Sequence, residues 1–266
     1  MSKALFMKNL RAHWKLVLLF ALVLVMYLSI IAGMFDPASP GMMSQLESFN
    51  MSPELLAAFG FDAPNTDLAG FLAGYFYGML MLGFPLVLYG ILGNKLVSSM
   101  VEKGSMAAVL ASPMKRTRAA LTQGVFLLSA VSFLVLVVTL AGLAVAGARF
   151  PGLLDMRAFV QMNLGVLTLH AALSGVTFFA SCLFSDTRWS LALGSGLPVF
   201  FLLAHMLGNT GEKLHALRFL TPFSLYDAMD FVEGLPVLPQ TLILLFSAII
   251  LYTAGVLVFN RKDLAL

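Results

Sequence analysis

The residues AALTQGVFLLSAVSFLVLVVTLAGLAVAGA, at positions 119–148, contain no charged side chain. A helix needs about 20 consecutive apolar residues to cross the hydrocarbon core of a bilayer, and this run is longer than that. Arg118 directly precedes it and Arg149 directly follows it, so charged residues mark both ends. The run therefore predicts a transmembrane helix.

Other charge-free runs of sufficient length cover residues 16–34, 68–94, 158–185, 189–211 and 234–260. The 266-residue chain is 60% hydrophobic and only 11% charged, whereas soluble domains carry about 25% charged residues. The runs do not alternate in the way that strands of a membrane β-barrel do. We therefore expect an all-α membrane protein: a single domain over residues 1–266 with six transmembrane helices.

The distribution of charge predicts the orientation of these helices. Short cytoplasmic loops are enriched in Lys and Arg. With six spans, twelve of the 16 Lys and Arg fall on the side of both termini, and ten of the 13 Asp and Glu fall on the other side. We therefore expect a multi-pass protein of a bacterial cell membrane with both termini cytoplasmic. The enrichment of basic residues on the cytoplasmic side explains the basic pI, so we expect membrane lipids and no nucleic acid as partners.

The segment before the first run has the pattern of an amphipathic helix over residues 3–15. Apolar side chains recur at four-residue spacing and basic side chains lie roughly opposite them: Phe6, Leu10 and Trp14 against Lys8, Arg11 and Lys15. This pattern is typical of a helix that lies in the membrane interface. The alternative is a basic flank that only orients the first span.

The chemistry of common enzymes is missing from the sequence. It contains neither a GxxxxGK[ST] phosphate loop nor an HExxH motif. Ser195 and His205 are ten residues apart in one predicted helix, which separates them by about 15 Å along the axis and prevents their acting together. Cys182 is the single cysteine, so it cannot form an internal disulfide. We expect no enzymatic activity, no metal and no cofactor in this chain.

Polar residues form a stripe on the predicted fourth span. At about 100° per residue, its members fall within about 60° of one another: Asn163, His170, Ser174, Thr177 and Ser181. Polar groups are unfavourable against lipid, so the stripe should face protein or a cavity. Hydrogen bonding between helices and lining of a substrate path are both compatible with it. His205 of the fifth span, where Pro198 predicts a kink, would join such a path.

The predicted second span carries Gly70, Gly74 and Gly78 at four-residue spacing. Such a groove lets a helix approach closely, either within the monomer or from a second subunit. Gly83 and Pro85 predict a bend further along.

The connector over residues 95–123 is longer than two adjacent helices require. Gly104 should interrupt the chain, MAAVL (106–110) should form one helical turn, and Ser112 and Pro113 should end it. Lipid contact explains the basic residues that follow, but it does not require Glu102 or the apolar turn. Docking to a cytosolic partner explains all of these features.

Three motifs resemble the type-2 ABC exporter permeases. The connector EKGSMAAVLASPMKR is similar to a family segment in which an acidic residue and glycine precede Leu-x-Ser-Pro and a basic residue. The ending RKDL at 261–264 and the stretch LRFLTPFSLYDA at 217–228 are similar to family patterns near the last span. Ser105 departs from the family, which often has threonine there.

The resemblance implies the membrane permease of an ATP-driven exporter. Drugs, antimicrobial peptides, lipids and ions are all compatible with the apolar membrane portion, and a hydrophobic or amphipathic substrate is the expectation. The resemblance also implies pairing with a second permease and with separate cytosolic ATPase subunits, which bind the ATP and Mg. The coupling helix that contacts the ATPase would comprise Glu102, Lys103, Gly104, Met106, Leu110, Ser112, Pro113 and Arg116. Asn163, His170, Ser174, Thr177 and His205 would be candidates for the substrate path. The alternative is a polytopic membrane scaffold or regulatory protein without transport.

Overall fold

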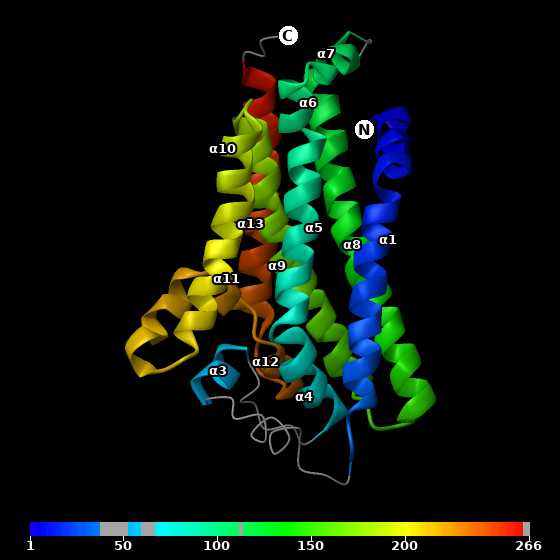
Figure 1. Ribbon diagram of the computed structural model, residues 1–266, viewed down its shortest axis with the longest axis vertical. Coiled ribbons are helices and arrows are strands. Elements are labelled where there is room, and N and C mark those ends of the chain that lie inside the picture. The colour runs from blue at the N-terminus through cyan, green and yellow to red at the C-terminus, as the bar shows by residue number, and fades with distance from the viewer. Residues whose placement is uncertain (38–52, 60–66, 112–113, 263–266) are drawn as a thin grey trace.

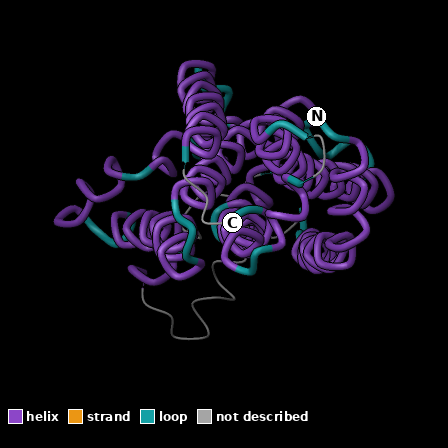
Figure 2. Tube along the Cα trace, turned by 90° about the horizontal axis from the view of Figure 1, so that it is seen from above, coloured by secondary structure: helices purple, strands orange, loops and turns teal. Residues whose placement is uncertain are grey.

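The computed structural model describes residues 1–37, 53–59, 67–111 and 114–262, and all regular structure in these ranges is helical. Six helices in the described ranges are long and apolar enough to cross a membrane, which confirms the expected class. They are Lys3–Gly33, Leu80–Glu102, Arg116–Arg149, Met156–Leu183, Thr187–Gly208 and Leu238–Arg261. The helices run side by side as an elongated bundle (Figure 1), seen along its length in Figure 2.

Four of the six are single α-helices: α1 (Lys3–Gly33), α8 (Arg116–Arg149), α9 (Met156–Leu183) and α13 (Leu238–Arg261). The other two are composite. The second joins α5 (Leu80–Leu96) to α6 (Ser98–Glu102), and the fifth joins α10 (Thr187–Leu191), the π-helix η2 (Ala192–Gly196) and α11 (Leu197–Gly208). The expected disruption near Pro198 is therefore a π-helical segment that ends just before this proline, a common way to bend a helix.

The two ends of the bundle differ. One end, called the basic end below, holds the start of α1, the last turn of α13, α6 and the short α7 (Ser105–Leu110) (Figure 1). The other end, called the distal end, holds α3 (Pro53–Ala58), α4 (Leu68–Leu72), α12 (Ala228–Val232) and the turn between α8 and α9.

Helix α9 lies at the centre of the packing. It contacts α5, α8, α13, η2 and α12. Of its most apolar 18-residue window, 72% is buried, against 28% for α1 and 22% for α13. The polar stripe therefore lies on the helix with the least exposure to lipid.

The structure shows no separate helix over residues 3–15, so the expectation of an independent N-terminal helix was wrong. These residues are the first turns of α1, which continues to Gly33. No proline or glycine occurs between Lys3 and Ile31 to interrupt the helix. Ser2 begins it, and its hydroxyl accepts a 3.4 Å hydrogen bond from the backbone N–H of Leu5.

The run at 68–94 is also not one helix. It forms α4, the π-helix η1 (Ala73–Tyr77) and then α5, with the break at Met79, whose φ and ψ are −130° and −59°. The bend was expected at Gly83 and Pro85, but α5 continues through both. The wider turn of a π-helix shifts the backbone register before the break. The pattern of prolines and glycines in the sequence does not predict such a π-helix.

The segment that carries Gly70 and Gly74 is buried within the monomer. Every residue from Leu68 to Tyr77 is buried without any second chain. A Cβ on Gly70 would lie 3.9 Å from Cε of Met229 and from Cγ1 of Val232, both on α12. These are ordinary van der Waals distances, so Gly70 faces α12; the close approach at this position is to Oδ1 of Asp67, 2.9 Å from such a Cβ.

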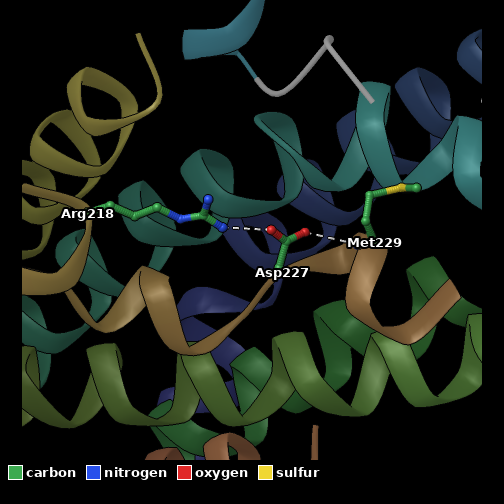
Figure 3. Close-up of polar contacts among 3 residues, drawn as sticks. All are labelled: Arg218, Asp227 and Met229. Carbon is green, nitrogen blue, oxygen red and sulfur yellow. Dashed lines mark hydrogen bonds and ion pairs between the residues drawn. The ribbon is translucent and has the colours of Figure 1, made fainter. Parts of the chain in front are cut away.

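An ion pair shapes the segment between α11 and α13. This segment forms the 3₁₀ helices η3 (Glu212–Leu220) and η4 (Pro222–Leu225) and then α12. Arg218 Nη2 lies 2.7 Å from Asp227 Oδ2. The other carboxylate oxygen of Asp227 accepts a 3.0 Å hydrogen bond from the N–H of Met229 and so caps α12 (Figure 3).

Candidate functional site: the connector and the polar stripe

The connector turns at Gly104, as the sequence predicts. Gly104 has φ +71° and ψ −3°, a left-handed conformation that glycine adopts without steric cost. It separates α6 from α7, and α7 includes the expected apolar turn at 106–110. Ser112 and Pro113, expected to end this turn, lie outside the described residues, as does the tail 263–266.

One side of the connector is exposed at the basic end. Glu102, Lys103, Gly104, Ser105 and Ala108 are all exposed. These residues form a small polar surface beyond the spans, to which a protein from the aqueous phase has access.

Met106 takes a different position from the one expected. We expected it to anchor a partner protein, but it is 1% exposed and belongs to the apolar core of its own chain. Burying the one large apolar side chain at the start of α7 attaches this short helix to the bundle. A partner would therefore contact the exposed side of α7, which holds Ser105 and Ala108, and Met106 instead holds α7 in place.

Glu102 connects the connector to the fifth span. Its Oε2 accepts hydrogen bonds from the N–H of Thr187, at 3.1 Å, and from the hydroxyl of Thr187. Thr187 is the first residue of α10, where a carboxylate is favourable because the N–H groups at a helix start are unpaired. Thr187 was not among the predicted site residues. The Ser-Asp-Thr sequence at 185–187, typical of a helix start, is the signal that could have found it.

Arg116 takes part in contacts that fix the end of α13. Its Nη1 donates a 3.1 Å hydrogen bond to the backbone oxygen of Lys262, and Nζ of Lys262 donates to the backbone oxygen of Cys182 at 3.3 Å. Burial lowers the pKa of Lys262. Arg116 therefore joins the start of α8 to the end of α13, and Lys262 joins that end to α9; the coupling role expected for Arg116 stays a prediction.

The polar stripe of α9 is buried along its whole length. Near the distal end, Asn163 Oδ1 accepts a 2.8 Å hydrogen bond from the Tyr77 hydroxyl. His170 Nε2 lies 2.7 Å from the backbone oxygen of Met81, and because a carbonyl only accepts, this nitrogen donates. Both contacts join α9 to the second span or the segment before it.

Three further stripe residues bond to neighbouring helices. Ser174 Oγ lies 3.0 Å from the hydroxyl of Tyr252 on α13. Thr177 donates to the oxygen of Gly194 in η2 at 2.5 Å, and Ser181 donates to the oxygen of Gly93 in α5 at 2.7 Å. The stripe thus makes hydrogen bonds between helices in this structure. Its part in a substrate path stays a prediction.

His205 is buried at the other end of the fifth span. Its ring centroid lies 5.8 Å from that of Phe223 in η4. Gly194, nearer the basic end, packs on the stripe, where a Cβ would lie 3.2 Å from Cα of Thr177. The fifth span therefore contacts α9 near the basic end and the η3–η4 segment near the distal end.

A second polar cluster at the basic end was missed by the sequence analysis. Asn9 Nδ2 donates to Oε1 of Gln123 at 2.5 Å, and the N–H of Ser2 donates to Oγ1 of Thr122 at 2.8 Å. These bonds join the start of α1 to α8. The adjacent polar residues Thr122 and Gln123, inside an otherwise apolar run, were the available signal.

No protein-family model and no curated protein matches this sequence. The resemblance to exporter permeases therefore rests on its three short motifs. Among the residues that the structure describes, no group of three or more His, Cys, Asp or Glu could hold a metal ion. The functional argument depends on the connector and on the helices that it contacts.

Proposed function

We propose that this chain is the permease subunit of an ATP-driven ABC exporter and that α7 is its contact with a cytosolic ATPase. One observation carries the proposal: a short helix with one exposed side stands beyond the spans at the basic end, held there by Met106, and Glu102 of the adjoining α6 is linked to α10. A connector that only joined two neighbouring helices would need neither feature.

The contacts of the connector define how movement would reach the spans. A push on α7 passes through α6 directly into α5, with which α6 forms one composite helix. The same push passes through Glu102 to Thr187 and so into the fifth span. The ATPase, with its ATP and Mg, drives transport by binding two arrangements of these helices with different affinity.

The substrate class follows from the spans. The most apolar window of each of the six candidate spans holds at most two charged residues, and charged cargo would be poorly accommodated among them. A hydrophobic or amphipathic molecule, moved out of the cytoplasm or the inner leaflet, fits this surface. A second permease pairs with this chain to complete the path between them.

Site-specific cross-linking in the native host tests the proposal. A photoactivatable amino acid replaces Ala108, on the exposed side of α7, and in a control replaces Leu153, which is 46% exposed in the turn between α8 and α9 at the distal end. We expect position 108, and not 153, to capture a protein with a phosphate-loop motif. Capture of no such ATPase at position 108 by an inserted, stable protein would favour the scaffold interpretation.

A further inference from the structure

An apolar groove runs between α1 and α8 near the basic end. Its volume is about 300 Å³. Side chains from both helices line it, among them Phe6, Leu10 and Trp14 of α1 and Phe126, Ser129 and Phe133 of α8. We call it the α1/α8 groove.

Part of the groove is closely packed aromatic side chains, and other lining side chains are exposed. The rings of Phe6 and Phe126 meet edge to face with centroids 5.4 Å apart. Leu10, Trp14 and Phe133 are 42%, 48% and 45% exposed. The hydroxyl of Ser129 is already bonded to the backbone oxygen of Val125 at 2.7 Å, so it does not call for a polar ligand. The groove suits a flexible hydrocarbon chain.

Two basic residues stand where the groove reaches the basic end. The Ser2–Thr122 hydrogen bond closes the gap between the helices there. Lys3 follows Ser2, and Arg118 lies one turn before Thr122, whose hydroxyl donates to the oxygen of Arg118 at 2.7 Å. Both basic side chains are exposed.

The helix geometry places Arg118 on the groove side of α8. At about 100° per residue, it falls within about 60° of Ser129 and Phe133. Neither α1 nor α8 contains an acidic residue, so no carboxylate of these helices competes for the two cations. Further along, the ammonium group of Lys15 lies 5.9 Å from the ring centroid of Trp14.

We propose that the α1/α8 groove binds one anionic phospholipid. An acyl chain lies in the groove, and the phosphate group is bound by Lys3 and Arg118. Charge complementarity favours an anionic over a zwitterionic lipid. A zwitterionic headgroup carries its own cation, so two basic side chains add less binding free energy for it. The site is independent of any transport function.

Quenching of Trp14 fluorescence measures this binding. The chain has two tryptophans, and Trp189, which is 64% exposed, is replaced in a Trp189→Phe background. The protein is reconstituted in unlabelled phosphatidylcholine. A small amount of a lipid with brominated acyl chains is added, which is phosphatidylglycerol in one series and phosphatidylcholine in the other. We expect brominated phosphatidylglycerol to quench Trp14 to the same extent at a several-fold lower content than brominated phosphatidylcholine.

Matched variants assign the preference to the groove. In that background, Arg118→Gln or Lys3→Gln should each reduce the preference for phosphatidylglycerol about fivefold, since one basic residue near a charged surface contributes about 1 kcal/mol. Arg261→Gln removes an equal, exposed charge at the end of α13 and should leave the preference unchanged. Melting temperatures of all three variants establish that they are folded.

The same measurements can overturn the proposal. Equal quenching by the two brominated lipids in the Trp189→Phe protein would mean that the groove is ordinary lipid-facing surface. A preference that survives in both Arg118→Gln and Lys3→Gln would mean that other charges hold the headgroup. Ser129→Phe fills the groove without changing charge, so unchanged preferential quenching in that folded variant would exclude the acyl chain from it.

Discussion

Gly142 and Gly147 provide a matched test of the packing, because both lie in α8 and differ in what a methyl group would meet. A Cβ on Gly142 would lie 2.4 Å from Cζ of Phe159 and 3.4 Å from Cδ2 of Leu28, whereas one on Gly147 would meet nothing within 4 Å. We expect Gly142→Ala to be less stable than Gly147→Ala, although the chemical change is identical.

The magnitude follows from two effects. Replacing glycine by alanine inside a helix stabilises it by about 0.8–1.0 kcal/mol, and this gain applies to both positions. Overfilling a packed core costs about 1–3 kcal/mol, and this cost applies to Gly142 alone. Phe159 is fully buried, with its ring centroid 6.2 Å from that of Tyr77, so the ring has little room to move. The helix gain cancels in the comparison, which leaves a difference of about 1–3 kcal/mol.

Equilibrium unfolding of the purified variants in mixed micelles, with increasing sodium dodecyl sulfate, gives the two free energies of unfolding. Phe159→Leu in the Gly142→Ala protein removes the ring atoms that the new methyl group meets. The double variant should therefore be more stable than the sum of the single changes predicts. If Gly142→Ala were as stable as Gly147→Ala, or more so, the close approach of α8 and α9 described here would be refuted.

Burial raises the pKa of Asp230, so its ionised form destabilises the fold: Asp230→Asn should raise the melting temperature at neutral pH, and the gain should vanish as the pH falls below the ordinary carboxyl pKa. Thr187→Val removes one exposed hydrogen bond to Glu102, so the melting temperature should change little while transport per ATP hydrolysed falls. A loss of stability without a change in coupling would contradict the role given to this bond. Ala108→Cys should react with a membrane-impermeant thiol reagent only in inverted membranes and Leu153→Cys only in intact cells, and the reverse pattern would overturn the charge-based orientation.

The spans were predictable because a long charge-free run has few alternatives. The runs at 119–148 and 158–185 match α8 and α9 within a few residues at each end. The prediction of one helix over residues 68–94 was wrong, because hydrophobicity does not distinguish one long helix from a buried short helix followed by a π-helix and a break. The prediction for residues 3–15 was wrong in the opposite way, because a separate helix was expected and one continuous helix is found. An amphipathic pattern indicates which face of a helix is apolar but not where the helix ends.

The candidate site was predictable in its residues more than in their contacts. The spacing of the α9 stripe correctly placed its polar side chains on one face, because a helix has a fixed period. The partners of that face could not be predicted, since Tyr77, Tyr252 and the oxygen of Gly194 come from distant parts of the chain. The same limitation applied to Met106, whose burial depends on how α7 lies against the bundle.

The stripe also indicates which span the proposed coupling would move. Among the described contacts, α9 holds the second span by four buried side-chain hydrogen bonds. His170 makes one, with the oxygen of Met81. Ser181 makes three, with the oxygen of Gly93 and with the N–H and the hydroxyl of Ser98. It holds the fifth span by one, from Thr177. A hydrogen bond between membrane helices contributes about 0.6 kcal/mol on average and at most about 1.7 kcal/mol, so a single one is easily exchanged.

Packing points to the same span. The most apolar window of the fifth span is 28% buried, against 67% for the second, so less apolar contact resists its displacement. Glu102 reaches this span at Thr187, its first residue. A force applied at α7 would therefore move α5 together with α9, to which it is firmly bonded, and would shift the fifth span relative to that pair. In that movement the Thr177–Gly194 bond is the contact within the stripe that must break or slide.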